Sequence, residues 1–237
     1  MSGHSKWATT KNKKAAIDAK RANSFTKASK NISIAARKGG DPETNFSLRM
    51  MIEKAKEVNM PRENIERAIK RGTGELGGAV LEEVMYEAYG PSGVALVVEA
   101  VTDNRSRTTS NVRAILNKYS GSLGATNSVA WMFDHKGVIR LPVEGVNSEE
   151  LSLELIDMGA DDVVEEDAGL TVYCTFTAYE GLKKALELKN LKPEYSELEW
   201  VAKDKQAVSE EVQQKTDKLI EAFEDDDDVN AVFTNIK

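Results

Sequence analysis

Basic side chains cluster near the start of the chain. Their types and spacing are suited to binding phosphate groups. Lys6 and Trp7 are followed closely by Lys11, Lys13 and Lys14. Ammonium groups attract phosphates and release their counterions, and an indole can stack on an unpaired base for roughly 1–3 kcal/mol. The pattern therefore favours binding to a polyanion. For Trp7 we weigh a second role equally with base stacking, in which its side chain packs as a hydrophobic group on the helical domain.

The charge of the chain is unevenly distributed. Residues 1–40 carry ten Lys and Arg side chains against one acid, Asp18, which is a net charge of +9. The whole chain of 237 residues has a net charge of −7, so the remainder carries −16. Such asymmetry is typical of a polyanion-binding module attached to an acidic body.

The basic residues continue along a predicted helix over residues 15–38. Its apolar residues fall on one face at helical spacing, and most of its basic residues fall on the opposite face. Arg105 and Arg107 open a later predicted helix, where they either extend this surface or pair with local acids. The candidate nucleic-acid-binding residues are Lys6, Trp7, Lys11, Lys13, Lys14, Lys20, Lys27, Lys30, Arg37, Lys38, Arg105 and Arg107.

No catalytic or metal-binding set is recognisable in the sequence. The chain has two histidines, His4 and His135, and one cysteine, Cys174. This inventory excludes an internal disulfide and a zinc site of the usual Cys/His kind. Cys174 lies in a predicted strand, where a small buried hydrophobe is the usual role of a free cysteine. We therefore expect no enzyme activity, no cofactor and no bound metal.

The elements that must position these residues change character along the chain. Three amphipathic helices are predicted within residues 1–75, and the glycine-rich residues 72–78 are predicted to be a flexible linker. Beyond the linker the predicted elements are strands at 83–89, 94–101, 128–133, 137–141, 162–166, 170–176, 195–202 and 229–234, and helices at 105–119, 149–158, 179–189 and 209–223.

This order predicts an α+β protein of three domains. An N-terminal three-helix domain covers residues 1–75. Two α/β sandwich domains of ferredoxin-like type follow, the second inserted in the first. The discontinuous domain covers 79–135 and 205–237, and the inserted domain covers 136–204, where the elements follow the β-α-β-β-α-β order. Five consecutive acids, Glu224–Asp228, are predicted to form a solvated loop, with a cation site as the less favoured alternative.

Several motifs resemble the YebC family. They are Gly3-His4-Ser5-Lys6-Trp7, Lys14-Ala15-Ala16, Phe25-Thr26-Lys27, Ala35-Ala36-Arg37-Lys38-Gly39-Gly40-Asp41-Pro42, Asn59-Met60-Pro61, Asn64-Ile65-Glu66-Arg67-Ala68-Ile69-Lys70-Arg71-Gly72, Tyr86-Glu87-Ala88-Tyr89-Gly90-Pro91, Asp103-Asn104-Arg105 and Ser128-Val129-Ala130-Trp131-Met132-Phe133. Asn31 and Asn127 depart from the expected Glu and Gly. The resemblance implies a helical domain and two α+β domains around a central cleft, without enzymatic activity.

The same resemblance implies two kinds of function. Bacterial members are described as probable transcriptional regulators that bind promoter DNA. Others act in translation, among them the mitochondrial translational activator of cytochrome c oxidase I and bacterial ribosome-associated factors that relieve stalling on proline runs. The family has no agreed catalytic or base-reading residues, so none is transferred to this chain.

We interpret the chain as a non-enzymatic, cytoplasmic regulator of gene expression from a bacterium. The preferred hypothesis is a ribosome-associated translation factor, because a basic, aromatic-tipped arm on an acidic body suits a crevice of ribosomal RNA. The alternative is a transcriptional regulator bound to promoter DNA. A protein-interaction scaffold and an enzyme with a cleft active site rank lower. No apolar run approaches the roughly 18 residues of a membrane span, so no membrane contact is expected. A monomer is the expected state.

Overall fold

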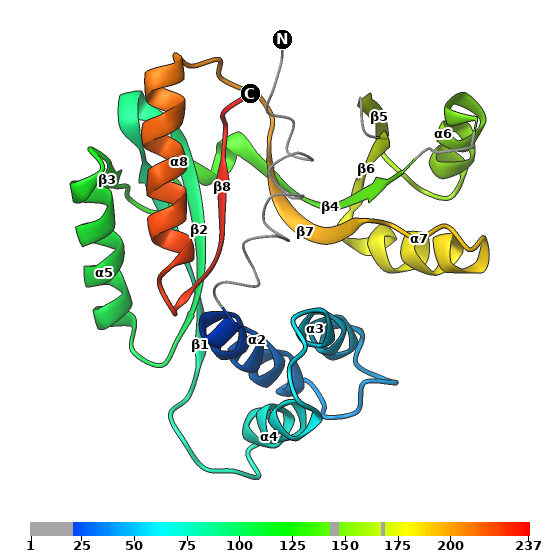
Figure 1. The fold of residues 1–237 in the computed structure, drawn as a ribbon, viewed down its shortest axis with the longest axis horizontal. Coiled ribbons are helices and arrows are strands. Elements are labelled where there is room, and N and C mark those ends of the chain that lie inside the picture. The colour runs from blue at the N-terminus through cyan, green and yellow to red at the C-terminus, as the bar shows by residue number, and fades with distance from the viewer. Residues whose placement is uncertain (1–20, 143–146, 167–168) are drawn as a thin grey trace. The chain divides into compact units, whose positions relative to one another are not determined.

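The computed structural model describes residues 21–142, 147–166 and 169–237. This part of the chain divides into two compact units, one of residues 21–133 with 202–237 and one of residues 134–201. The helices are α2 (Arg21–Ala36), α3 (Phe46–Glu57), α4 (Arg62–Gly72), α5 (Arg105–Lys118), α6 (Ser148–Asp157), α7 (Phe176–Leu188) and α8 (Glu210–Glu224), with the short 3₁₀ helices η1 (Pro91–Gly93) and η2 (Ala130–Met132). The strands are β1 (Glu82–Tyr89), β2 (Ala95–Thr102), β3 (Ser122–Leu123), β4 (Phe133–Leu141), β5 (Asp162–Glu166), β6 (Gly169–Thr175), β7 (Tyr195–Ala202) and β8 (Val229–Thr234) (Figure 1).

Helices α2, α3 and α4 share one small apolar core. The buried residues that form it are Ile32, Ala35, Ala36, Leu48, Ala55, Met60, Ile65 and Ala68. Asn45 caps α3, because its side chain accepts a hydrogen bond from the Leu48 backbone N–H at 3.1 Å. Ser33 Oγ donates to the Ala68 carbonyl at 2.9 Å and joins α2 to α4. The predicted three-helix arrangement is confirmed, with residues 15–20 of the first predicted helix outside the described residues.

The crossing of α2 and α4 leaves no room for a side chain at Gly72. A Cβ atom there would lie 2.7 Å from the Ala36 Cβ and nearer still to the Ser33 carbonyl oxygen. We expect Gly72→Ala to push the two helices apart and to lower the free energy of unfolding by about 1–3 kcal/mol. Urea denaturation measures this loss. Gly77→Ala is the control, because a Cβ at Gly77 would have no atom within 4 Å. Equal stability of the two variants would contradict the tight crossing.

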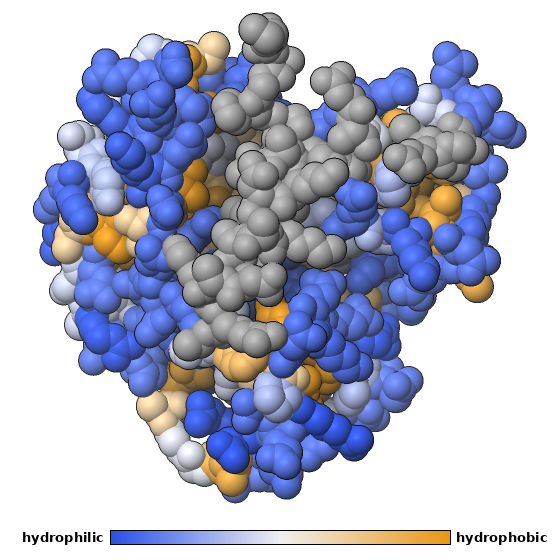
Figure 2. Space-filling view, viewed as in Figure 1, coloured by the Kyte–Doolittle hydropathy of each residue, from blue (hydrophilic) through white to orange (hydrophobic). Residues whose placement is uncertain are grey.

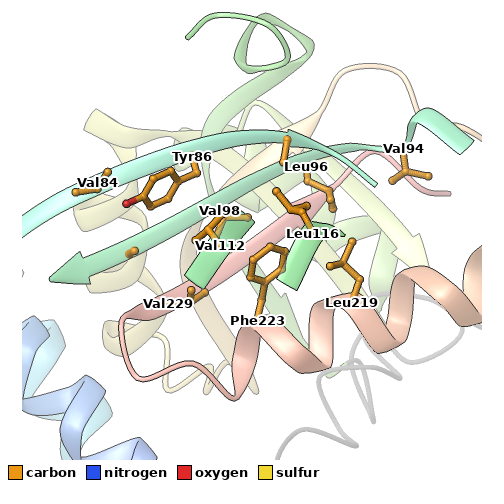
Figure 3. Packing of buried hydrophobic residues seen from close by; sticks show 12 residues of the cluster. Val84, Tyr86, Val94, Leu96, Val98, Val112, Leu116, Leu219, Phe223 and Val229 are labelled. Carbon is orange, nitrogen blue, oxygen red and sulfur yellow. The ribbon is translucent and has the colours of Figure 1, made fainter. Parts of the chain in front are cut away.

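The larger unit also contains a four-stranded antiparallel sheet in the order β3-β1-β2-β8. Alternate residues of β1 and β2 face the same side and pair across the strands, as Tyr86 does with Val98. Helices α5 and α8 pack on that side (Figure 3). The cluster consists of Val84, Tyr86, Ala88, Val94, Leu96, Val98, Ala100, Val112, Leu116, Leu219, Phe223 and Val229. In Figure 2 the outer side of α8 is mostly hydrophilic, as expected for an amphipathic helix.

The smaller unit has a sheet in the order β5-β6-β4-β7. Helix α6 connects β4 to β5 and α7 connects β6 to β7, which is the split β-α-β arrangement of ferredoxin-like folds. Its buried residues include Ile139, Leu141, Leu155, Leu170, Val172 and Leu182. The predicted β-α-β-β-α-β order and the α+β class are therefore confirmed. The bounds assigned to the three domains stay a prediction.

The predicted strand at 128–133 is wrong. The chain forms a loop and the 3₁₀ helix η2 there, and β4 is one continuous strand. The cause is Glu87, whose carboxylate accepts hydrogen bonds from the backbone N–H groups of Val129 and Ala130 at 2.7 Å. The Asn127 N–H donates to the same carboxylate at 2.5 Å. Backbone donors that are paired with a carboxylate cannot form a strand ladder.

The junction of β6 and α7 also differs from the prediction. Helix α7 begins at Phe176 rather than at 179, and β6 ends at Thr175. The Thr175 hydroxyl accepts a hydrogen bond from the Ala178 backbone N–H at 3.2 Å, so this residue caps the helix directly after the strand. None of the helices in the described ranges is long and apolar enough to cross a membrane.

Candidate nucleic-acid interface

Two predicted site residues, Lys27 and Lys30, lie on one side of α2 and contact the end of α8 and the turn that follows it. We call the five acids Glu224–Asp228 the acidic turn. Lys27 Nζ donates a hydrogen bond to the Glu224 carbonyl at 2.6 Å. Lys30 Nζ donates to the Asp227 carbonyl at 2.8 Å and lies 2.5 Å from a carboxylate oxygen of Asp228. Figure 1 shows α2 beside the turn between α8 and β8.

The electrostatics of α8 explain why its end needs cations from elsewhere in the chain. The last carbonyls of a helix carry partial negative charge and have no partners within the helix. Helix α8 has no basic residue in its last turn, and the acidic turn follows directly. Helix α2 supplies the missing donors: Lys27 to the Glu224 carbonyl, and the Asn23 side-chain amide to the Asp225 carbonyl at 2.9 Å. Burial lowers the pKa of Lys27 more than the nearby acids raise it.

Asp228 is the centre of this contact. Its residue surface is only 3% exposed, and its carboxylate accepts hydrogen bonds from Thr108 at 2.7 Å and from Arg107 at 2.9 Å, besides its contact with Lys30. Burial alone would raise the pKa of this carboxyl. The hydrogen bonds from Lys30, Thr108 and Arg107 outweigh burial and lower the pKa to about 2.

The prediction that Glu224–Asp228 is simply a solvated loop is therefore wrong for Asp228 and for the backbone carbonyls of the turn. The side chains of Asp225 and Asp227 are exposed, as predicted. The sequence suggests the solvated loop because the partners of the turn on α2 lie 197 to 202 residues away, and its partners Thr108 and Arg107 on α5 lie 120 and 121 residues away. The pattern of residues within a short segment cannot indicate a contact with residues so far away in the sequence.

Arg107 pairs with acids, which was one of the two predicted alternatives. It lies 2.8 Å from Asp103 and 2.9 Å from Asp228. The hydrogen bond with Asp228 is the main cause of its raised pKa. Arg105, two positions earlier on α5, is exposed.

Two more predicted site residues that the structure describes, Arg37 and Lys38, directly follow α2. Arg37 donates to the Leu81 carbonyl, whereas Lys38 is exposed. The structure thus brings Lys27, Lys30 and Arg107 together on the acidic turn. Six predicted residues lie outside the described residues: Lys6, Trp7, Lys11, Lys13, Lys14 and Lys20.

Sequence reasoning missed Asn23 and Asp228. A signal for both was present, because a run of acids at the C-terminus of a helix opposes the helix dipole and requires cations from another element. That signal predicts a partner but does not identify it. In the described part of the chain, no group of three or more His, Cys, Asp or Glu side chains is arranged to hold a metal ion.

Cys174 has the structural role that the sequence predicts. It is fully buried, and its Sγ lies 3.8 Å from the Gly137 carbonyl oxygen. Burial is the main cause that raises the pKa of its thiol to about 11. A thiol with so high a pKa is almost wholly protonated near neutral pH and is a poor nucleophile.

Two family models match the chain. Residues 5–75 match the TACO1/YebC protein N-terminal domain, and residues 81–236 match the TACO1/YebC second and third domain. This chain belongs to the TACO1/YebC family. The match covers both the basic N-terminal region and the two sheets.

Relatives and a solved structure agree with this family. The chain is 47% identical to a probable transcriptional regulatory protein of Thermoanaerobacter pseudethanolicus, over 100% of this chain and 97% of that protein. It is 48% identical to a probable transcriptional regulatory protein of Treponema denticola, over 100% and 96% of the two chains. A conserved hypothetical protein from Aquifex aeolicus has a crystal structure with a TM-score of 0.84 and 43% identity, covering 94% of this chain and 93% of that one.

The names of these relatives describe regulation rather than catalysis. They favour the alternative of a transcriptional regulator over the ribosome hypothesis that the sequence led us to prefer.

Proposed function

We propose that this chain is a regulator of transcription that binds promoter DNA non-covalently through its basic N-terminal region. The observation that carries the proposal is the charge of residues 1–40, where ten Lys and Arg stand against one acid. Lys27 and Lys30 add support from the structure, because they are placed on one side of α2 where they bind oxygen acceptors. The lysines hold the DNA backbone, and Trp7 positions the N-terminal arm.

Ribosomal RNA is the second candidate partner. The observation in its favour is that α4 exposes the acids Glu63 and Glu66, which would meet a duplex backbone badly. An acidic body behind a basic arm fits a folded RNA surface better than flat docking on a duplex. Under this alternative the same lysines would contact ribosomal RNA and the protein would act in translation.

The test compares the wild-type chain with a five-lysine variant, in which Lys6, Lys11, Lys13, Lys14 and Lys20 are changed to Gln. We expect the variant to lose about 100-fold in affinity for duplex DNA near physiological salt, because about five phosphate contacts are removed. Fluorescence anisotropy measures the loss. The matched control changes five exposed lysines of the acidic body, Lys118, Lys192, Lys205, Lys218 and Lys237, to Gln.

Two further experiments distinguish promoter DNA from the ribosome as the partner. Genomic fragments retained by the protein are sequenced, and footprints on the enriched sites are repeated with point-mutated sites. Enriched promoter fragments whose binding is lost on mutation would support the main proposal. Cosedimentation with ribosomes, lost in the five-lysine variant and without promoter enrichment, would favour the second candidate. Failure of all arms would contradict both.

A further inference from the structure

Two of the lysines that the proposed function assigns to phosphate binding, Lys27 and Lys30, are occupied by the protein itself. We infer that the acidic turn Glu224–Asp228 fills a phosphate-binding site on α2 in this structure, and that phosphates of a bound nucleic acid displace it. The inference rests on the proposed function, because it names the regulation of the same site.

The contact sets a row of donors on α2 against oxygen acceptors of the acidic turn, one of which is a carboxylate. Asn23, Lys27 and Lys30 stand at i, i+4 and i+7, which places them along one side of α2. Each donates to a backbone carbonyl oxygen of the acidic turn at 2.6 to 2.9 Å, and Lys30 also lies 2.5 Å from the Asp228 carboxylate. A row of lysine and amide donors that meets a row of oxygen acceptors is also how proteins hold a phosphate backbone.

The contact is built so that it can open. When Lys30 leaves, the Asp228 carboxylate keeps its hydrogen bonds with Arg107 and Thr108 on α5, so its charge stays compensated. The turn is therefore anchored, and α2 is the element that moves. Residues 73–80, which connect the helices to β1, are all exposed. An exposed connection of this kind restrains little of the movement of the helices.

The contacts of α2 with the rest of the larger unit must also break when α2 moves away, among them its packing against β2 and two side-chain hydrogen bonds. The Asn230 side-chain amide donates to Asn31 Oδ1 at 2.7 Å, and Arg37 donates to the Leu81 carbonyl. Both are polar, and water can replace them on opening. The phosphates of the nucleic acid thus compete with the acidic turn and with the other contacts that hold α2 in the larger unit.

The acidic turn also repels phosphate directly. The carboxylates of Asp225 and Asp227 are exposed beside the Lys27 and Lys30 contacts. Removing these two charges weakens both the hold on α2 and the repulsion of an approaching backbone. We expect Asp225→Asn with Asp227→Asn to bind a short DNA duplex about 3- to 10-fold more tightly at 0.1 M salt, with the gain shrinking as salt screens it.

The matched control removes two exposed acids of α8, one at its first residue and one at its middle, in the double variant Glu210→Gln with Asp217→Asn. It has the same net charge and leaves the acidic turn intact. Affinity for the duplex is measured by anisotropy for the wild-type chain and both double variants, after urea denaturation has confirmed that each is folded. Tighter binding in the acidic-turn variant alone supports the inference, and equal affinity in the two variants overturns it.

A reversible cross-link between α2 and β8 provides a second test, in which the acidic turn is not changed. Asn31→Cys and Asn230→Cys place thiols at a side-chain contact between α2 and β8, and a short methanethiosulfonate cross-linker joins them. The cross-linked protein is expected to bind the duplex at least about 10-fold more weakly, with affinity restored by a reductant. Unchanged affinity on cross-linking overturns the inference but leaves the proposed function standing. Absence of duplex binding in every form overturns the proposed function and the inference with it.

Discussion

Replacing Asp228 with alanine is expected to lower the free energy of unfolding by about 3–5 kcal/mol. The carboxylate is buried and accepts from Lys30, Arg107 and Thr108. Its removal leaves two cations and a hydroxyl without their shared acceptor. It also removes a side chain of the turn that contacts both Lys30 on α2 and Arg107 on α5. Loss of an acceptor costs more than an average hydrogen bond because the donors that remain are partly desolvated.

Urea denaturation of Asp228→Ala measures this cost beside Asp227→Ala. The Asp227 side chain is exposed, and only its carbonyl contacts Lys30. We therefore expect Asp227→Ala to change the free energy of unfolding by less than about 0.5 kcal/mol. A loss below about 1 kcal/mol for Asp228→Ala would show that the carboxylate is not the centre of the contact.

The low pKa of Asp228 predicts a pH dependence with a definite sign. Its pKa is lowered from the ordinary 3.8 to about 2 in the folded chain, so the folded state prefers the carboxylate. Its contribution to stability is full above the unfolded pKa and is lost as the pH falls from about 4 to about 2. The difference in unfolding free energy between wild type and Asp228→Asn should shrink over this range. A difference that stays constant from pH 5 to pH 2 would contradict the assignment.

The second large effect is expected at Glu87, where alanine should cost about 3–4 kcal/mol. The side chain is buried, with 5% of the residue exposed, and its carboxylate accepts from the backbone N–H groups of Asn127, Val129 and Ala130. Burial alone would raise the pKa of Glu87. The hydrogen bonds from the backbone outweigh it and lower the pKa. Without the carboxylate, the loop before β4 loses its organising acceptor.

Two readouts check this prediction. Urea denaturation compares Glu87→Ala with Glu83→Ala, an exposed acid on the same strand β1. Hydrogen exchange should become faster at the amides of Asn127, Val129 and Ala130 in Glu87→Ala only. If those amides exchange as slowly as in the wild-type chain, Glu87 does not hold the loop.

The fold was largely predictable because it depends on local patterns. Alternation along β1 and β2 and helical spacing along α5 and α8 place apolar residues on facing surfaces, whatever the distance between the elements in sequence. The same applies to the β-α-β-β-α-β order of the smaller unit. The strand predicted at 128–133 was wrong because the structure there depends on a contact that is not local. Its backbone donors are paired with the side chain of Glu87 on β1.

The candidate site was predictable in part. Lys27 and Lys30 do lie together on α2, as the helical spacing predicts. Their partner was not predictable, because the acidic turn is nearly two hundred residues away and its run of acids alone suggests exposure to solvent. Arg107 shows the same limit. Its pairing with Asp103 at i, i+4 is a local pattern, whereas its pairing with Asp228 is not.

The central claim is that the basic N-terminal region binds nucleic-acid phosphate. The most direct test is the salt dependence of duplex binding, measured by anisotropy for the wild-type chain and the five-lysine variant. For about five phosphate contacts, the logarithm of the binding constant should fall with the logarithm of the salt concentration at a slope near −4.5, and the variant should be much flatter. A wild-type slope near zero, or the same slope in both proteins, would contradict the claim.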